Sequence, residues 1–189
     1  MRAFIAIGLP QGIKDSLAGI QDELRSSGAD VKWIRPENIH LTLKFLGDID
    51  EIKKDKISNI LERITAKRSD FRIRISSLGA FPKITSPRVI WVGIDEGDKE
   101  SKDIAAELEE EAAKIGIPKE ERDFSSHITI GRKRSPSNLD KLINCLKEKT
   151  GLGGKDMGFY AGKITLFKST LTPKGPIYEA LKEATLKNT

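Results

Sequence analysis

Apolar and polar positions along the chain follow two periods, one typical of strands and one typical of helices. Residues 1–9 (MRAFIAIGL) have a strand-like pattern, whereas after Pro10 the apolar residues recur every three or four positions until Gly28. Proline is favoured at a helix start, so a helix is predicted between these two residues. The same period predicts helices at about 51–67, 98–115 and 136–149. Strands are predicted for VKWI, HLTLKFLG, FRIRISSL, RVIWVGI, HITIGR, GFYAGKITLFKS and IYEAL, with FPKITSP as a turn.

The two halves of the chain repeat one order of elements. In each half, a strand that begins with His is followed by a helix, a long strand, a Pro-led turn and a further strand. His40 and His127 are 87 residues apart, and Pro87 and Pro176 are 89 apart. This near-constant offset predicts an internal duplication. We expect an α+β fold in which residues 1–189 form a single bilobal domain. Its two pseudo-symmetric lobes would be antiparallel sheets backed by helices, with a central cleft between them.

The two histidines are the most informative residues of the chain, because they are its only ones and both begin the same pattern. The patterns are His-Leu-Thr-Leu at 40–43 and His-Ile-Thr-Ile at 127–130. Alternate side chains of a strand share a face, so His and Thr of each copy would point one way and the two aliphatic residues into the core. A single histidine on a half-buried strand is most often a packing residue. Two copies that use the whole histidine inventory favour a shared functional site.

Composition narrows the possible classes of protein. Charged residues make up 32% of the chain and hydrophobic residues 38%, which is typical of a folded domain. No apolar run reaches the ~20 residues of a membrane span, and the N-terminus does not resemble a signal peptide, so we expect a cytoplasmic protein without a membrane partner. The net charge of +5 permits a phosphate-bearing partner. The single Cys145 and the absence of a third recurrent ligand argue against a metal site, and no cofactor is expected.

Two histidines on opposite sides of a phosphate can divide acid and base roles. Imidazole has an ordinary pKa near ~6.5, so at neutral pH one ring can be neutral while the other carries a proton. The neutral ring would take a proton from the attacking hydroxyl or water, and the protonated ring would give one to the leaving oxygen. The hydroxyls of Thr42 and Thr129 would donate hydrogen bonds to the non-bridging phosphate oxygens. The residues alone do not say which histidine is the acid.

Paired His-x-Thr-x motifs in a duplicated α+β chain resemble the two-histidine phosphoesterase superfamily. Within it, WIRPENIHLTLKFLGD and HITIGR resemble the RNA 2′,3′-cyclic phosphodiesterases, also called 2′-5′ RNA ligases, over nearly the whole chain. The resemblance implies hydrolysis of an RNA terminal 2′,3′-cyclic phosphate to a 2′-phosphomonoester, and reversible 2′-5′ ligation. It also implies that His40 is the proton donor and His127 the proton acceptor, with Thr42 and Thr129 holding the phosphate.

Three further residues are candidates for substrate binding. Phe45 and Arg132 each follow a motif histidine by five positions, and the resemblance implies Phe and Arg there. Phe45 would stack on a base and Arg132 would pair with a phosphate. An odd offset from the histidine places both side chains on the buried face of a regular strand, so each needs a bulge or a strand end to reach the cleft. Gly131 makes a bulge or strand end plausible next to Arg132. For Phe45, packing in the core is the main alternative. Lys44 has the parity of His40 and is a candidate to line a basic cleft, with a solvated charge at the strand edge as the main alternative.

Two other functions remain open at this point. One is a phosphodiesterase for a small nucleotide, such as a cyclic ADP-ribose phosphate or a 2′-5′ oligoadenylate. The other is a non-catalytic module that binds RNA or nucleotides in the same cleft. Intact motifs in both halves favour an enzyme acting on RNA ends that carry a 2′,3′-cyclic phosphate. A monomer is expected.

Overall fold

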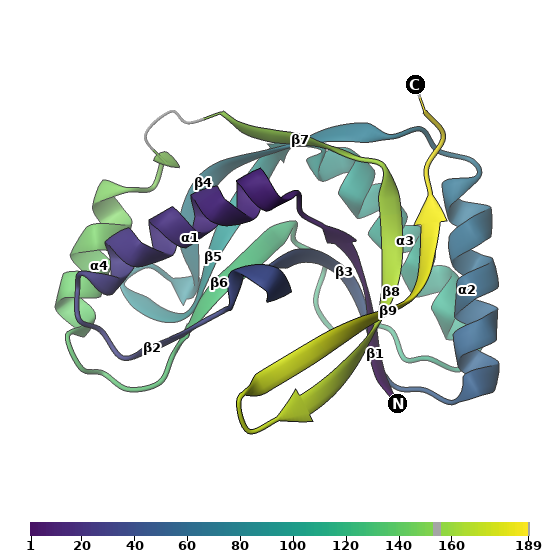
Figure 1. Ribbon diagram of the computed structural model, residues 1–189, viewed down its shortest axis with the longest axis horizontal. Coiled ribbons are helices and arrows are strands. Elements are labelled where there is room, and N and C mark those ends of the chain that lie inside the picture. The colour runs from purple at the N-terminus through teal and green to yellow at the C-terminus, as the bar shows by residue number, and fades with distance from the viewer. Residues whose placement is uncertain (153–155, 189) are drawn as a thin grey trace.

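Two antiparallel sheets, each with helices on one face, make up the protein in a computed structural model that describes residues 1–152 and 156–188 (Figure 1). The four-stranded sheet has the order β3-β1-β8-β9, and the five-stranded sheet has the order β2-β6-β5-β4-β7. The α+β class, the two antiparallel sheets and the helical backing predicted from the sequence are confirmed. The strands and helices have these bounds: β1 Arg2–Gly8, α1 Gln11–Arg25, β2 Val31–Trp33, β3 His40–Asp48, α2 Glu51–Thr65, β4 Phe71–Lys83, β5 Ser86–Glu96, α3 Asp98–Lys114, β6 His127–Lys133, α4 Leu139–Glu148, β7 Met157–Ala161, β8 Lys163–Thr172 and β9 Gly175–Thr185, with a short 3-10 helix η1 at Pro36–Asn38.

Neither sheet is made by one half of the chain alone. The first half supplies β1 and β3 to the four-stranded sheet but sends β4 into the five-stranded one, where β4 pairs with β5 and β7. In the second half, β5 and β6 belong to the five-stranded sheet, whereas β8 pairs with β1 in the four-stranded sheet. Strands of both halves thus meet in each sheet: β8 and β9 join β1 and β3, and β2 and β4 join β6 and β7, in keeping with the predicted duplication.

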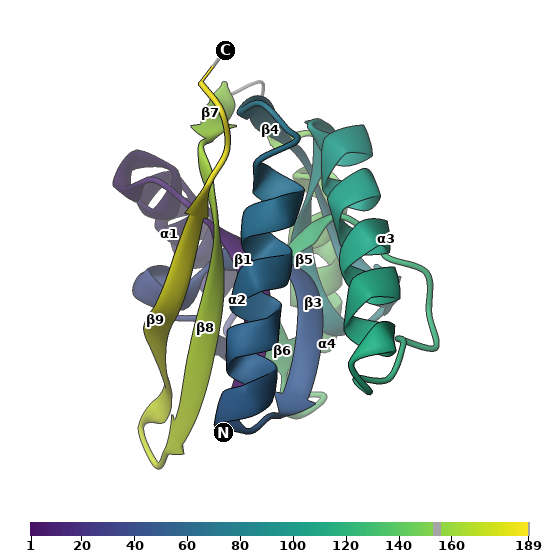
Figure 2. The same ribbon diagram turned by 90° about the vertical axis from the view of Figure 1, so that its right-hand side faces the viewer.

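The helices are exchanged in the same way. Helix α1 follows β1 in the chain but packs against β6, β7 and α4 of the other sheet, whereas α3 follows β5 and packs against β3 and α2. Figure 2 shows α2 and α3 side by side on the outer face of the four-stranded sheet. Each motif strand is therefore supported from behind by a helix of the opposite half. The packing faces are aliphatic, as the helical period predicts; α2, for example, buries Ile57, Ile60, Leu61 and Ile64.

Two segments differ from the sequence prediction. The predicted turn FPKITSP is mostly strand, because β4 continues to Lys83 and β5 begins at Ser86, with Pro82 opposite Pro87 in the ladder. The predicted strand GFYAGKITLFKS is two strands interrupted at Gly162: β7 belongs to the five-stranded sheet and β8 to the four-stranded one. In both cases long-range pairing, which a local pattern does not contain, decides where the strand ends.

Candidate active site

The two histidines begin strands that lie next to each other where the sheets meet. His40 is the first residue of β3 and His127 the first residue of β6, and these two strands are in contact. The Nδ1 atom of His40 donates to the carbonyl oxygen of Asn38 at 2.7 Å, and that of His127 donates to the carbonyl oxygen of Ser125 at 2.7 Å. Each ring is thus held by the backbone two residues before it. Among the described residues, no hydrogen bond occupies Nε2 of either ring, so Nε2 is the nitrogen left for a substrate.

Burial lowers the pKa of both imidazoles. For His40 the pKa falls from 6.5 to about 4, chiefly because the ring is buried and to a smaller extent because of the positive charge of Lys14, while the bond to Asn38 opposes the shift. The pKa of His127 is also lowered by burial, with a further contribution from the charge of Arg132. Both rings are therefore neutral at pH 7. A phosphate anion between them would favour protonation and raise both values.

Aromatic rings enclose His40 more fully than His127. Phe4 stacks on His40 with ring centroids 4.7 Å apart, and Tyr178 meets it edge-on at 5.4 Å. Phe167 stacks in turn on Phe4, at 5.3 Å. Within the described part of the chain, His127 has one such neighbour, Phe81, in an edge contact at 5.0 Å. Phe4, Phe167 and Phe81 are residues of the site that the sequence analysis missed. The signal available for Phe4 was its place on the predicted first strand.

The two threonines lie on the same face as the histidines, as the strand period predicts. Thr42 and Thr129 are half-buried, whereas the aliphatic residues on either side of each are buried. Neither hydroxyl has a hydrogen-bond partner within residues 1–152 and 156–188. Both hydroxyls are available to donate to an anion held between the histidines.

A bulge at the same position of both motif strands decides where the following residues point. In β3, Thr42 pairs with Ala6 and Lys44 with Ile5, so Leu43 is an extra residue without a partner. In β6, Ile130 is the corresponding extra residue between Thr129 and Gly131. The extra residue reverses the alternation of faces beyond it. The bulge that Phe45 and Arg132 were expected to need is present in both strands.

The structure corrects the prediction for Lys44 and settles the alternative for Phe45. The Lys44 side chain is fully buried behind the sheet, where Nζ donates to Oε1 of Glu109 at 2.7 Å and to the carbonyl oxygen of Pro118 at 3.2 Å. It does not line the cleft, because the bulge turns it to the core side. Phe45 is 55% exposed instead of packed in the core, and its ring lies 6.3 Å from that of Phe4.

Arg132 is exposed on the cleft side of β6. Its charge lowers the pKa of His127 in its own sheet and opposes the burial-driven rise in the pKa of Tyr178 in the other sheet. It has no ion-pair partner in the described part of the chain. The guanidinium thus lies between the two sheets and is free to bind an anion.

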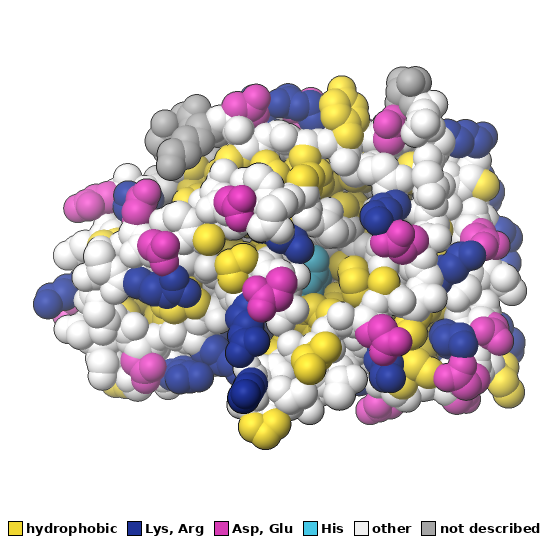
Figure 3. Space-filling model, viewed as in Figure 1, with side chains coloured by type: hydrophobic (Ala, Val, Ile, Leu, Met, Phe, Trp, Pro, Cys, Tyr) yellow, Lys and Arg dark blue, Asp and Glu magenta, His cyan; other side chains and the backbone are white. Residues whose placement is uncertain are grey.

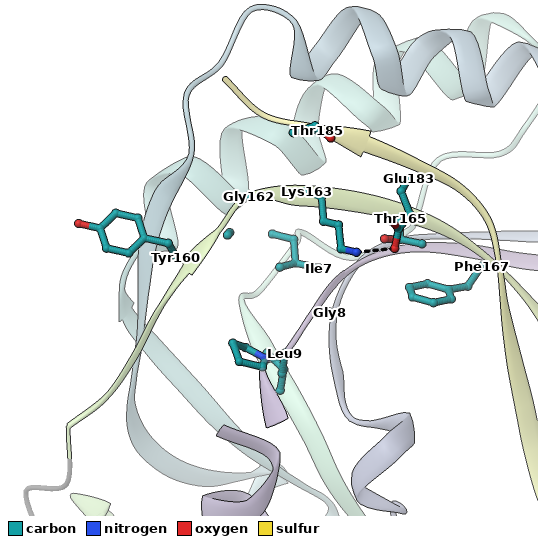
Figure 4. Close-up of a pocket in the computed structure, with 12 residues that line it drawn as sticks. Ile7, Gly8, Leu9, Tyr160, Gly162, Lys163, Thr165, Phe167, Glu183 and Thr185 are labelled. Atoms are coloured by element: carbon teal, nitrogen blue, oxygen red, sulfur yellow. Dashed lines mark hydrogen bonds and ion pairs between the residues drawn. The ribbon is translucent and has the colours of Figure 1, made fainter. Parts of the chain in front are cut away.

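A cavity of about 580 Å³ is lined by residues of β1, β7, β8 and β9 (Figure 4). Gly8, which lines it, pairs with His40 in the sheet, and Phe167, which also lines it, belongs to the rings around His40. At the far side, Lys163 and Glu183 form an ion pair at 2.6 Å, while the Tyr160 ring points away from the cavity. The cavity is therefore large enough for a group much bigger than a phosphate, although neither histidine lines it.

No three His, Cys, Asp or Glu side chains gather into a set that could hold a metal ion within residues 1–152 and 156–188. None of the described helices is long and apolar enough to cross a membrane. The free Cys145 is half-buried on α4.

A duplicated α+β fold that brings one His-x-Thr strand from each half to a common site defines the two-histidine phosphoesterase class. The model of the "LigT like Phosphoesterase" family matches the chain twice, at residues 7–91 and 92–178. The chain belongs to the LigT-like phosphoesterase family, and the two matches coincide with the two halves of the duplication.

Relatives and solved structures agree with this family. The RNA 2′,3′-cyclic phosphodiesterase of Methanothermobacter thermautotrophicus is 38% identical over 178 residues, which cover 94% of this chain and 95% of the relative. The protein of the same name from Methanocaldococcus jannaschii is 38% identical over 184 residues, covering 97% and 99%. The structure of E. coli LigT complexed with 3′-AMP superposes with a TM-score of 0.81 at 25% identity, covering 98% of this chain and 97% of the other.

Proposed function

We propose that this protein hydrolyses the terminal 2′,3′-cyclic phosphate of RNA to a 2′-phosphomonoester without a metal ion. The observation that carries the proposal is the pair of histidines with identical backbone anchors, 2.7 Å from Nδ1 in both cases, and an unoccupied Nε2 on each ring. The names of the relatives from M. thermautotrophicus and M. jannaschii support the same reaction. Reversible 2′-5′ ligation would be the same chemistry with an RNA hydroxyl in place of water.

In the proposed reaction, Nε2 of His127 takes a proton from water as the water oxygen forms a bond to phosphorus. The bond between phosphorus and the 3′ oxygen breaks, and Nε2–H of His40 gives its proton to that oxygen. The products are a 2′-phosphate and a free 3′-hydroxyl. Thr42 and Thr129 donate to the non-bridging oxygens, where negative charge builds up in the transition state.

The assignment of donor and acceptor rests on the family resemblance, and the pKa values of the two histidines in the protein alone run against it. His40, the proposed donor, has a pKa of about 4, while the pKa of His127 is lowered less because its ring is less enclosed. The proposed roles thus require that the bound cyclic phosphate raise the pKa of His40. The bulge side chains would complete the site, with Arg132 on a phosphate and Phe45 on a base.

Positive charges beside the site favour RNA over a small nucleotide. Lys32 lies opposite Arg132 in the β2–β6 ladder, and neither side chain has an ion-pair partner among the described residues. Arg35 reaches the tip of the β8–β9 hairpin, where it donates to the carbonyl oxygen of Lys174 at 3.0 Å. Figure 3 shows Lys and Arg side chains gathered over this region, beside the hollow in which a histidine is visible. Such a group of charges attracts a polyanion.

The test is turnover of an RNA oligonucleotide that ends in a 2′,3′-cyclic phosphate, measured in EDTA with the product isomer identified. We expect a 2′-phosphate from the wild-type protein and a loss of about 10²-fold or more for His40→Ala and for His127→Ala. Lys99→Gln, a change on the outer helix α3, is the control and should leave the rate unchanged. Turnover that does not depend on the histidines, or that disappears in EDTA, would contradict the proposal. Binding without turnover in the wild type would indicate a non-catalytic module.

The same experiment with a 2′,3′-cyclic mononucleotide separates the two enzymatic alternatives, because a small-nucleotide phosphodiesterase would prefer it to the oligonucleotide. A single bilobal domain over residues 1–189 is supported by the strand exchange between the halves. The monomeric state and the cytoplasmic location stay predictions.

A further inference from the structure

Gln21 is a fully buried amide on a helix face that is otherwise aliphatic. It lies on α1 among Ile13, Leu17, Ile20 and Leu24, and its exposed fraction is 0%. A buried amide is costly unless it forms hydrogen bonds. Its Nε2 donates to the carbonyl oxygen of Ile34 at 2.7 Å and to that of Ile130 at 2.8 Å. The location of these two carbonyl groups explains why a polar side chain occupies this position.

Both carbonyls belong to the bulge in β6 and the segment packed against it. Ile130 is the extra residue of the bulge, and its carbonyl also accepts the backbone N–H of Ile34 at 3.0 Å. Ile34 directly follows β2, whose Trp33 pairs with Gly131. Gln21 thus joins α1, the end of β2 and the bulge at one point, from the side of the sheet opposite the cleft.

The bulge determines which way Arg132 points. With regular alternation, Arg132 would have the parity of the buried Ile128 and Ile130; with the extra residue, it is on the face of His127 and Thr129. There is little room for the strand to shift, because a Cβ atom on Gly131 would lie 2.9 Å from the side chains of Trp33 and Val31. An interaction that stabilises the bulge therefore also fixes the direction in which the Arg132 side chain points.

The other motif strand has a corresponding polar link. Lys44 follows the extra residue of β3 and reaches Glu109 of α3 at 2.7 Å. Glu109 and Gln21 are 88 residues apart, close to the 87 that separate the histidines, so they occupy matching places on matching helices. Both bulges are therefore tied to the helix of the opposite half, by unrelated chemical groups. Because a polar contact to a helix occurs at both bulges, we infer that these contacts stabilise the bulges.

We infer that Gln21 is a positioning residue that holds the β6 bulge and thereby directs Arg132 to the substrate phosphate. The inference rests on the proposed function, because it assigns Arg132 a phosphate. It makes a specific prediction: removing the amide affects the reaction through Arg132, so it has no further effect once Arg132 is gone.

The test is a double-mutant cycle with Gln21→Met and Arg132→Ala, using the cyclic-phosphate oligonucleotide. Met nearly keeps the size of Gln but cannot donate to the two carbonyls. In the wild-type background we expect Gln21→Met to lower kcat/KM about tenfold, mainly through KM, because the guanidinium is misplaced. In the Arg132→Ala background the same change should have an effect of less than twofold. Gln11→Met, on the exposed first turn of the same helix, is the matched control and should change neither.

A purely structural role would lower kcat/KM by the same factor in both backgrounds, and that result would overturn the inference. If Gln21→Met does not fold, as judged by its thermal unfolding, Gly131→Ala disturbs the same bulge from the strand side and enters the same cycle. Binding of adenosine 2′-monophosphate by calorimetry gives a readout that does not need turnover. An inactive wild type would count against the proposed function, whereas equal losses in an active protein would count against the role of Gln21 alone.

Discussion

The strands β3 and β6 carry the same motif and the same bulge but differ in what surrounds them. β3 is an edge strand of its sheet, so the side chain of Lys44 has space to pass behind the sheet to α3. β6 lies between β2 and β5, and β2 occupies the corresponding space with Trp33 and Val31; the residue there is Gly131. The bulge places Phe45 on the exposed face in β3 and Arg132 on the exposed face in β6. A duplicated motif has thus acquired two different side chains at one geometric position.

The surroundings of the histidines differ as well. His40 lies between Phe4 and Tyr178, whereas His127 has Phe81 on one side and the charge of Arg132 nearby. The more enclosed ring has the lower pKa. Identical residues with identical backbone anchors therefore differ in proton affinity, and the proposed roles require bound substrate to reverse that order.

The largest effect on stability is expected from breaking the link behind β3. Lys44→Met leaves Glu109 and the Pro118 carbonyl without their buried partner, and we expect it to lower the free energy of unfolding by about 3 kcal/mol. Gln21→Met, which removes a neutral donor behind β6, should cost only about 1–2 kcal/mol. Urea denaturation of both variants measures the difference. The double change Lys44→Met with Glu109→Leu should recover much of the loss; a Lys44→Met protein as stable as wild type would show that the buried pair does not hold β3.

A pH-dependent difference is expected between the two histidines. The pKa of folded His40 is below its unfolded value of 6.5, so the ring favours the folded state above pH 6.5, and this contribution is lost as the pH falls from 6.5 towards 4. At pH 4.5 the loss amounts to about 2–3 kcal/mol relative to pH 7. His40→Gln should therefore lose less stability on acidification than the wild type by that amount, and His127→Gln should differ from wild type by less. Equal acid sensitivity in all three proteins would contradict the unequal burial of the rings.

Arg132 and Phe45, the two side chains that the bulges direct to the cleft, should differ in their effect on substrate binding. Arg132→Ala removes a charge-assisted contact to phosphate and is expected to raise KM about ten- to hundredfold. Phe45→Ala removes at most one stacking contact at an exposed position and should raise KM less than tenfold, only for substrates with a base in reach. Steady-state kinetics on the oligonucleotide compare the two. A larger effect at Phe45 than at Arg132 would reverse their proposed importance.

The smallest effect is expected at Lys32, which lies beside Arg132 and has no counterpart next to Phe45 because β3 is an edge strand. Lys32→Gln should lower kcat/KM for the oligonucleotide a few-fold at low salt and leave the cyclic mononucleotide unaffected. Lys99→Gln, on α3, serves as the charge-matched control. Equal losses for the long and short substrates would place Lys32 in the reaction site instead of on the path of the RNA.

Local patterns in the sequence predicted most of the fold and the placement of the candidate site residues at its centre. The strand period located His40, Thr42, His127 and Thr129 on common faces, and the repeat spacing predicted the duplication. The bulge was considered as a requirement for Phe45 and Arg132, but its presence depends on pairing with β1 and β5, so the regular period gave Lys44 the wrong face.

The pairing of β4 and β8 and the role of Gln21 could not be predicted from the sequence either, because both depend on contacts between residues far apart in the chain. The exchange of β4 and β8 between the sheets is a choice among distant partners that one strand's sequence does not encode. Gln21 reads as one polar residue beside an aliphatic stripe until its two backbone acceptors are known. Residues whose role depends on a neighbour far along the chain are the ones a single sequence does not reveal.

The most direct test of the central claim, that the two histidines divide acid and base roles, uses a substrate in which sulfur replaces the 3′ oxygen of the cyclic phosphate. A thiolate leaves without a proton, so only the acid becomes dispensable. We predict that this substrate restores most of the lost rate to His40→Ala and none to His127→Ala. Equal rescue of both variants, or of neither, would contradict the division, and rescue of His127→Ala alone would exchange the proposed roles.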